Sequence, residues 1–137
     1  MIIKISNRLY QKIEDDAKKR SPQEACGLVS GLKEGEQIEI KKIYPLENLD
    51  QAADHFSMDP KEQFAVVKET RQRGEKLLGN YHSHPVTPAR PSKEDKRLAY
   101  DQDLIYFIIS LQDEASLKAF KIKDHQDVTE IEIIKED

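Results

Sequence analysis

The chain has 137 residues and a mass of 15.8 kDa, which is the size of one domain. Hydrophobic residues make up 37% of the chain and charged residues 35%, so an apolar core beneath a highly charged surface is expected. The net charge of −4 argues against a general nucleic-acid binder, because such proteins are more often basic.

Hydrophobic periodicity predicts the order of elements in the first third of the chain. A strand, a helix and two further strands are expected over residues 2–5, 7–19, 25–32 and 37–46. Leu9, Ile13 and Ala17 are spaced four apart and mark the buried face of the helix. Ser6 or the residue after it can cap this helix, and Pro22 ends it.

A second helix should begin at Asp59, whose side chain can cap it, with Glu62 in the position that completes a capping box. Phe64 and Val67 are expected to face the core, and Gly74 can end the helix.

The remainder of the chain is rich in strand patterns. A proline-rich loop at residues 85–91 separates a predicted strand from a short helix that Ser92 opens and that ends near residue 101. Strands are expected over residues 76–84, 104–111, 116–123 and 128–135. The order of elements therefore predicts one mixed α/β domain spanning residues 1–137, with two or three helices.

We expect a cytoplasmic protein without a membrane segment. Residues 1–6 lack the apolar region of a secretory signal. The longest apolar run, residues 104–109, is far shorter than the roughly 20 residues of a membrane-spanning helix. The single cysteine, Cys26, excludes an intramolecular disulfide and is compatible with a reducing compartment.

The residues that indicate chemistry surround the proline-rich loop. His82 and His84 lie two apart on a predicted strand, so both imidazoles should point to one face. Asp95 follows the loop, which allows it to fold back toward that face. Two histidines and a carboxylate, with a fourth position open for water, form the ligand set of a catalytic zinc. Such a zinc lowers the pKa of its water to about 7.

Each of these residues also has an ordinary structural interpretation. A histidine pair on a strand is more often not a ligand pair, and Ser92 and Asp95 have the spacing of a helix capping box. Capping and chemistry are compatible, because a helix N-terminus can hold both a hydroxyl and a carboxylate in place.

The run from His82 to Asp95 resembles the signature of the JAB1/MPN/Mov34 (JAMM) zinc metalloenzymes: His-x-His-Pro, six variable residues, then Ser-x-x-Asp. The segment Pro-Ala-Arg-Pro-Ser most resembles the sequences of the small bacterial members. The family also has a glutamate after the first helix, and Glu24 matches that position, although by itself it would be taken for a solvated residue. One departure is Asn80, which stands where relatives often have an aromatic or small residue.

The resemblance implies a role for each matching residue. His82, His84 and Asp95 would bind Zn²⁺. Glu24 would take a proton from the attacking water and pass it to the leaving amine. Ser92 would donate a hydrogen bond to the carbonyl oxygen as that oxygen becomes negative.

The resemblance also implies a fold and a substrate. It implies a cytidine-deaminase-like MPN domain with a central mixed β-sheet flanked by helices. The leading substrate is an amide or isopeptide bond after the C-terminal Gly-Gly of a ubiquitin-like or sulfur-carrier protein, with release of cysteine from a carrier as the first candidate. The short chain has little room for the insertions with which larger relatives hold ubiquitin. Family members often pair, which leaves a homodimer open.

Three alternatives stay open at this stage: a catalytically silent MPN scaffold, a zinc peptidase with another substrate, and a DNA-repair-associated branch. That branch usually has Ser-Gly after the motif proline, whereas Val86 and Thr87 follow here. Of the other reactive residues, Cys26 lies in an apolar run and is expected to be a buried, inert thiol. His55 and His125 are expected at the surface.

Overall fold

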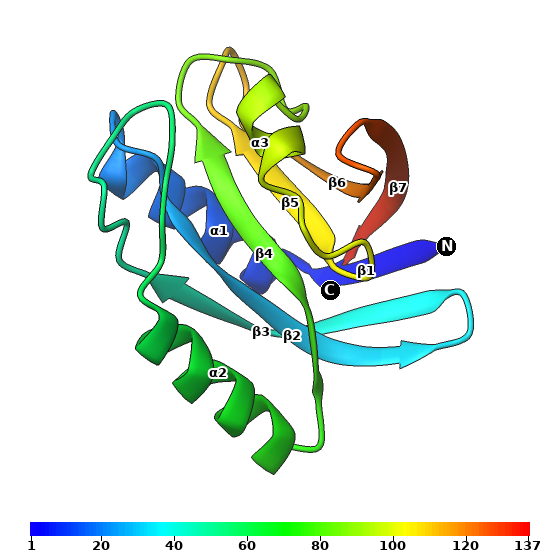
Figure 1. The fold of residues 1–137 in the computed structure, drawn as a ribbon. Coiled ribbons are helices and arrows are strands. Elements are labelled where there is room, and N and C mark those ends of the chain that lie inside the picture. The colour runs from blue at the N-terminus through cyan, green and yellow to red at the C-terminus, as the bar shows by residue number, and fades with distance from the viewer.

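Seven strands form one mixed sheet in a computed structural model that describes all residues, 1–137 (Figure 1). In chain order the elements are β1 (Ile2–Ser6), α1 (Asn7–Arg20), β2 (Cys26–Glu34), β3 (Gln37–Leu46), α2 (Pro60–Gln72), β4 (Lys76–His84), α3 (Lys93–Arg97), β5 (Ile105–Ser110), β6 (Ser116–Lys123) and β7 (Asp127–Glu136). Every predicted element is present, and most boundaries agree within two residues.

The strand order is β1-β3-β2-β4-β5-β6-β7, and β1 also pairs with β7, so the sheet closes into a barrel. The pairs β1/β3, β1/β7 and β4/β5 are parallel and the others are antiparallel. The expectation of a mixed sheet is confirmed. Its closure was not foreseen, because periodicity does not report a pairing between the first and last strands.

Helix α1 packs against the inner face of this sheet. Leu9, Ile13 and Ala17 are buried as predicted, in the main core with residues of β1 to β7. The Ser6 hydroxyl accepts a hydrogen bond from the Leu9 N–H at 3.1 Å, which confirms the predicted cap. None of the helices combines the length and the apolar composition that a membrane-spanning helix requires.

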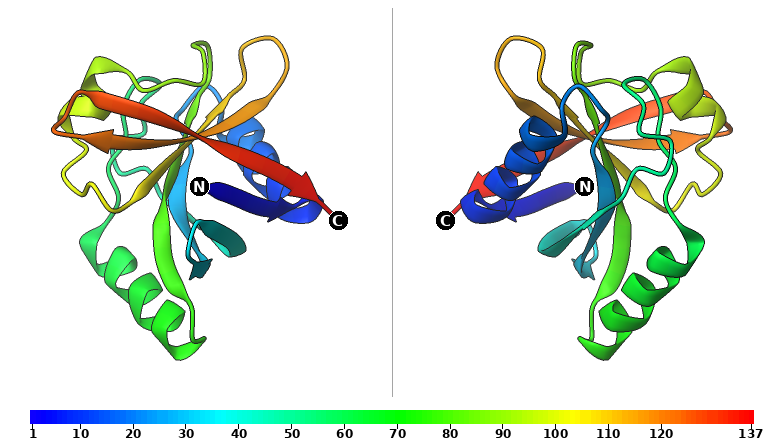
Figure 2. Two further views of the ribbon diagram at one scale, coloured as in Figure 1. Left: turned by 90° about the vertical axis from the view of Figure 1, so that its right-hand side faces the viewer. Right: turned by 90° about the vertical axis from the view of Figure 1, so that its left-hand side faces the viewer.

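Helix α2 lies across β4 and β2 from α1 (Figure 2) and packs through a small cluster of Leu28, Tyr44 and Val66. The prediction that Phe64 faces the core is wrong, since its side chain is 72% exposed. Val66 and Thr70 are the buried residues of this helix. Phe64 lies two positions before Val66, about 200° around the helix axis, and therefore points to solvent.

The start of α2 differs in one further detail from the prediction. Asp59 caps the helix by accepting a hydrogen bond from the Lys61 N–H at 2.9 Å. The Glu62 carboxylate keeps one buried oxygen without a partner, so the reciprocal half of the predicted capping box is missing. Val67 is half-buried, and Gly74 follows the helix with a φ of +71°, as its predicted role requires.

Helix α3 is shorter than predicted and ends at Arg97. Its chain leaves the helical path because Ala99 and Tyr100 make tighter backbone bonds, to the Lys96 and Leu98 carbonyls respectively. The predicted capping box between Ser92 and Asp95 is present in both directions, so the helix begins where the sequence predicts.

A glycine sets the distance between the two strands behind the site. A Cβ atom on Gly79 of β4 would lie 1.8 Å from the Ile105 carbonyl oxygen of β5. No side chain fits there without moving the backbone, so Gly79 allows β4 to approach β5 closely. Strand β4 carries both motif histidines and lies in the middle of the sheet order.

Candidate metal centre

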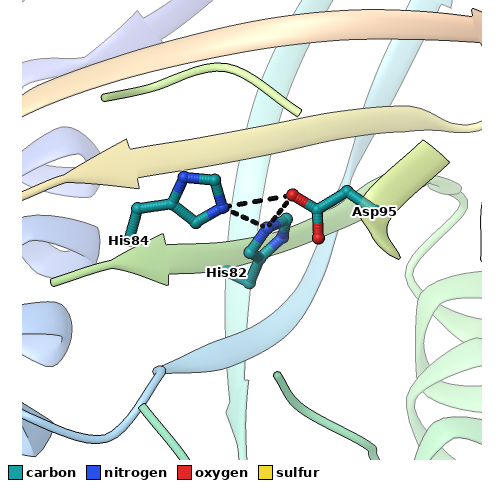
Figure 3. Close-up of side chains that lie close together, drawn as sticks. All are labelled: His82, His84 and Asp95. Carbon is teal, nitrogen blue, oxygen red and sulfur yellow. Dashed lines mark hydrogen bonds and ion pairs between the residues drawn. The ribbon is translucent and has the colours of Figure 1, made fainter. Parts of the chain in front are cut away.

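The side chains of His82, His84 and Asp95 converge at one point (Figure 3). The two Nε2 atoms lie 3.1 Å apart, and Asp95 Oδ2 lies 3.2 Å from His82 Nε2 and 3.1 Å from His84 Nε2. Both histidines lie at the C-terminal end of β4, and Asp95 lies in the first turn of α3. The predicted alternation of the strand and the return of the proline-rich loop are therefore both confirmed.

The triangle formed by these three atoms has the size of a metal-binding face. In a tetrahedral site with metal–ligand distances of about 2.0–2.1 Å, neighbouring ligand atoms lie about 3.3–3.4 Å apart. The measured sides are close to that length. Two imidazole nitrogens and one carboxylate oxygen are also a donor set that zinc accepts. The residues present thus fit a zinc ion in both geometry and donor chemistry.

Hydrogen bonds from the loop orient the ligand atoms. His84 Nδ1 donates to the Pro88 carbonyl at 2.9 Å, so Nε2 is the ring nitrogen that faces Asp95 and His82. The Ser92 N–H donates to Asp95 Oδ2 at 2.9 Å. The same oxygen therefore caps α3 and points at the histidines.

The electrostatics of the cluster favour positive charge at the point of convergence. Burial raises the pKa of Asp95, but hydrogen bonds from His82 and His84 outweigh it and hold that pKa far below its usual range. Burial lowers the pKa of His84, but hydrogen bonds to Asp95 and the Pro88 carbonyl outweigh it, so the net shift is upward. Both shifts are those expected where a cation is stabilised.

Glu24 lies directly before β2, opposite His84 in the continuation of the β2/β4 ladder. Its backbone is fixed on both sides: its N–H donates to the Ala52 carbonyl at 2.7 Å, and Asn48 Nδ2 donates to its carbonyl at 3.1 Å. Next to it, Ser83 holds Ala25 through two hydrogen bonds. The whole residue is also buried, which excludes the alternative of a solvated glutamate.

Glu24 is only 4% exposed, and its carboxyl oxygen Oε1 is buried without a hydrogen-bond partner. Burial is the main cause that raises the pKa of Glu24, to about 8, while the charge of His84 acts in the opposite direction. A carboxyl with a pKa near neutrality, beside a candidate metal site, has the properties of a group that accepts and returns a proton.

Ser92 lies at the exposed N-cap of α3, next to Asp95. Its hydroxyl oxygen accepts the Asp95 N–H at 3.0 Å. Because the oxygen is the acceptor in this cap, its proton remains available for a further hydrogen bond. The predicted capping role is confirmed, and it leaves a donor free at the edge of the site.

One residue of the site was not anticipated from sequence. Phe56, in the loop before α2, stacks on the His82 ring with centroids 4.8 Å apart and an angle of 24° between the planes. A cavity of about 400 Å³ extends from His82 and Asp95 along this loop. Its lining comprises Phe56, Ser57, Met58, Gln63, Asn80, His82, Asp95, Leu98, Tyr100 and Tyr106. A single aromatic in an irregular loop carries no periodic signal that could have identified it.

The remaining reactive residues lie where the sequence predicts. Cys26 is fully buried, and burial raises the pKa of its thiol to about 11, which disfavours the nucleophilic thiolate. His55 is exposed and contacts Asp54. His125 is exposed and packs against Tyr100. None of these three belongs to the histidine–aspartate cluster.

Comparison with known proteins agrees with the geometry. Residues 6–123 match the family model described as prokaryotic homologs of the JAB domain. The chain belongs to this family. Solved structures agree: a protein from Desulfitobacterium hafniense has a TM-score of 0.90 at 47% identity, covering 98% of this chain and 93% of the other. A JAB1/MPN domain protein from Archaeoglobus fulgidus has a TM-score of 0.62 at 27% identity, covering 96% and 97%.

Two curated relatives of this JAB domain have named activities. A CysO-cysteine peptidase from Mycobacterium tuberculosis is 30% identical over 110 residues, which is 79% of this chain and 74% of the relative. A desampylase from Pyrococcus furiosus is 27% identical over 116 residues, which is 85% of this chain and 79% of the relative. The α/β MPN fold expected from the motif is thus found in a small prokaryotic JAB domain.

Proposed function

We propose that this JAB domain is a zinc-dependent hydrolase that cleaves the amide or isopeptide bond after the C-terminal Gly-Gly of a ubiquitin-like or sulfur-carrier protein. The observation that carries the proposal is the convergence of His82, His84 and Asp95 with the buried carboxyl of Glu24 beside them. The named activities of the M. tuberculosis and P. furiosus relatives support this class of substrate.

In this proposal His82, His84 and Asp95 hold Zn²⁺, which when bound supplies an acidic water and polarises the scissile carbonyl. Glu24 orients the attacking water, accepts its proton and returns that proton to the nitrogen of the leaving amine. Burial raises the pKa of Glu24 in the metal-free chain and a bound cation would lower it again, which would bring the carboxyl into the range where it can both accept and release a proton near neutral pH.

Ser92 acts on the carbonyl oxygen. Its hydroxyl oxygen accepts the Asp95 N–H, which holds the oxygen in place and leaves its proton free to donate to another acceptor. A donor held in advance stabilises the negative charge that develops on the carbonyl oxygen, without reorganisation during the reaction.

The leading substrate is a sulfur carrier with a cysteine attached to its terminal glycine. A tail without side chains fits a narrow approach to the metal, and the extended tail can add to the domain through main-chain hydrogen bonds. A lysine isopeptide of a ubiquitin-like protein is the second candidate, which the name of the P. furiosus relative favours. Cytoplasmic location, pairing of two copies and relation to the cytidine-deaminase fold remain predictions.

The experiment uses the zinc-loaded protein with two substrates in parallel: a Gly-Gly carrier with cysteine appended, and a ubiquitin-like isopeptide. Mass spectrometry reports the loss of cysteine or of the modified lysine. Release of cysteine without isopeptide cleavage supports the first candidate. If one zinc is bound but neither bond is cleaved, a zinc peptidase with another substrate becomes the better explanation, and if no zinc binds, a silent scaffold does.

A further inference from the structure

The cavity beside the metal-binding residues has mostly apolar walls. Its ring-bearing and aliphatic lining residues are Phe56, Met58, Leu98, Tyr100 and Tyr106. Leu98 and Tyr100 are 42% and 75% exposed, and the Tyr100 ring packs edge-on against His125. The one charged side chain in the lining is Asp95, and it is already engaged by both histidines. The cavity therefore fits an uncharged, apolar group.

Asn80 is the polar residue inside this cavity that lacks a partner. Its Oδ1 atom is buried and accepts no hydrogen bond from the chain. A buried acceptor without a donor lowers stability, so such an atom points to a ligand that supplies an N–H. A peptide main chain does so and also offers a carbonyl to the other half of the amide.

Asn80, His82 and His84 lie two apart along β4 and point to the same face. Neighbouring residues of this row are about 6.6 Å apart, since a strand rises about 3.3 Å per residue. Glu24, which must reach the leaving amine, is opposite His84 at the far end of the row from Asn80. An extended substrate thus has its leaving amine toward His84 and its acyl side toward Asn80.

We propose that this cavity is a specificity subsite for the residue directly before the substrate's Gly-Gly, that it selects an apolar side chain there, and that Asn80 hydrogen-bonds the main chain of that residue. The inference rests on the proposed function for the identity of the tail. If the scissile carbonyl belongs to the last glycine, the residue before Gly-Gly is two positions upstream, about 6.6 Å in extended chain. Asn80 and His82 are separated by the same distance, so the side chain of the residue before Gly-Gly reaches the cavity.

The test measures binding separately from cleavage. Zinc-loaded protein carrying Glu24→Gln is titrated with fluorescent hexapeptides that end in X-Gly-Gly, where X is Leu, Ala, Asp or Lys. We expect Leu to bind about tenfold more tightly than Ala, because a buried side chain gains about that much from its extra carbons. Asp and Lys should bind more weakly than Leu, because the one charged side chain of the lining, Asp95, is already engaged by both histidines.

Adding Asn80→Leu should weaken binding of every peptide about five- to tenfold, which corresponds to one hydrogen bond. The same substitution should leave the unfolding midpoint of the free protein unchanged or higher, because the removed oxygen has no partner. A purely structural role for Asn80 predicts the opposite change in the midpoint. Gln72→Leu, an exposed amide at the far end of α2, is the matched control and should change neither quantity.

Equal affinity for all four peptides, or no effect of Asn80→Leu on binding, overturns the subsite. Cleavage is scored independently with protein that retains Glu24. A protein that cleaves carriers without preference at X keeps the proposed function and loses the subsite. If Leu peptides bind most tightly, Asn80→Leu weakens that binding and no carrier is cleaved, the subsite stands and the proposed hydrolysis is refuted.

Discussion

Replacing Glu24 by glutamine should strongly reduce the rate of hydrolysis, retain zinc and change how stability depends on pH. Glutamine keeps the shape of the protonated glutamate but can neither take nor return a proton. General acid–base catalysis contributes roughly 10²–10⁴-fold, so the hydrolysis rate should fall by about that factor. Zinc content should stay near one per chain, since Glu24 is not among the three converging ligand residues.

The stability of the metal-free protein provides a second, independent readout. The pKa of Glu24 rises from an ordinary value of 4.5 to about 8 on folding, mainly through burial. Below pH 4.5 the carboxyl is protonated in both the folded and unfolded states and carries no penalty. As the pH rises toward 8, the unfolded state loses this proton and the folded state keeps it, so the folded protein becomes progressively less stable.

One pKa unit corresponds to about 1.36 kcal/mol, so the penalty at pH 8–9 has an upper bound of about 5 kcal/mol, and about 2–4 kcal/mol is expected. Glu24→Gln removes this penalty. Urea denaturation with a chelator should therefore show the variant and the original protein within about 1 kcal/mol at pH 4.5, with the variant about 2–4 kcal/mol more stable at pH 8.5. Zinc should reduce the difference, because a nearby cation lowers the pKa of Glu24.

An equal pH slope for both proteins in the presence of chelator would show that Glu24 is not buried as an acid, and the reasoning about its pKa would fail. Hydrolysis at the original rate by Glu24→Gln would refute its assignment as the proton carrier. The two outcomes are separate, because the first concerns burial and the second concerns the reaction.

Substitutions at three further residues test other parts of the structure. Asp95→Asn should lower zinc affinity at least tenfold in calorimetry yet keep the helix cap. Asp95→Ala should lower zinc affinity and also reduce the free energy of unfolding by about 1 kcal/mol, because the cap is lost. Equal zinc binding by the original protein and both variants would contradict the ligand assignment. Tyr81→Phe removes an O–H that donates to Asp16 at 2.6 Å and should lower the free energy of unfolding by about 2 kcal/mol in urea, an effect whose absence would count against this hydrogen bond. Phe64→Ser should change stability by less than about 0.5 kcal/mol, and a loss above 2 kcal/mol would restore Phe64 to the core.

The ligand geometry could be predicted because it depends on local rules. The alternation of a strand places His82 and His84 on one face, and the capping box at Ser92 fixes where Asp95 lies in its helix. Both rules act within a few residues. The proline-rich loop that joins them needed only to be long enough to bring Asp95 back to the histidines, which its length and prolines already indicated.

Other features depend on contacts between distant segments, which sequence pattern does not report. The closed sheet requires β1 to pair with β7, at opposite ends of the chain. The burial of Val66 in place of Phe64 depends on which side of α2 meets the outer face of β2 and β3. Phe56 reaches His82 from an irregular loop, where neither alternation nor helical spacing applies.

The double use of Asp95 links metal binding to local folding. A five-residue helix is too short to be stable by itself, so α3 depends on its cap and on contacts with the rest of the chain. One oxygen of Asp95 accepts the Ser92 N–H and also lies within 3.2 Å of both histidines of β4. An ion shared by these three residues would join α3 to β4, across the proline-rich loop. It would thereby hold Ser92 and the cavity residues Leu98 and Tyr100 in place. Binding of one ion would then order both the proposed subsite and the proposed catalytic residues.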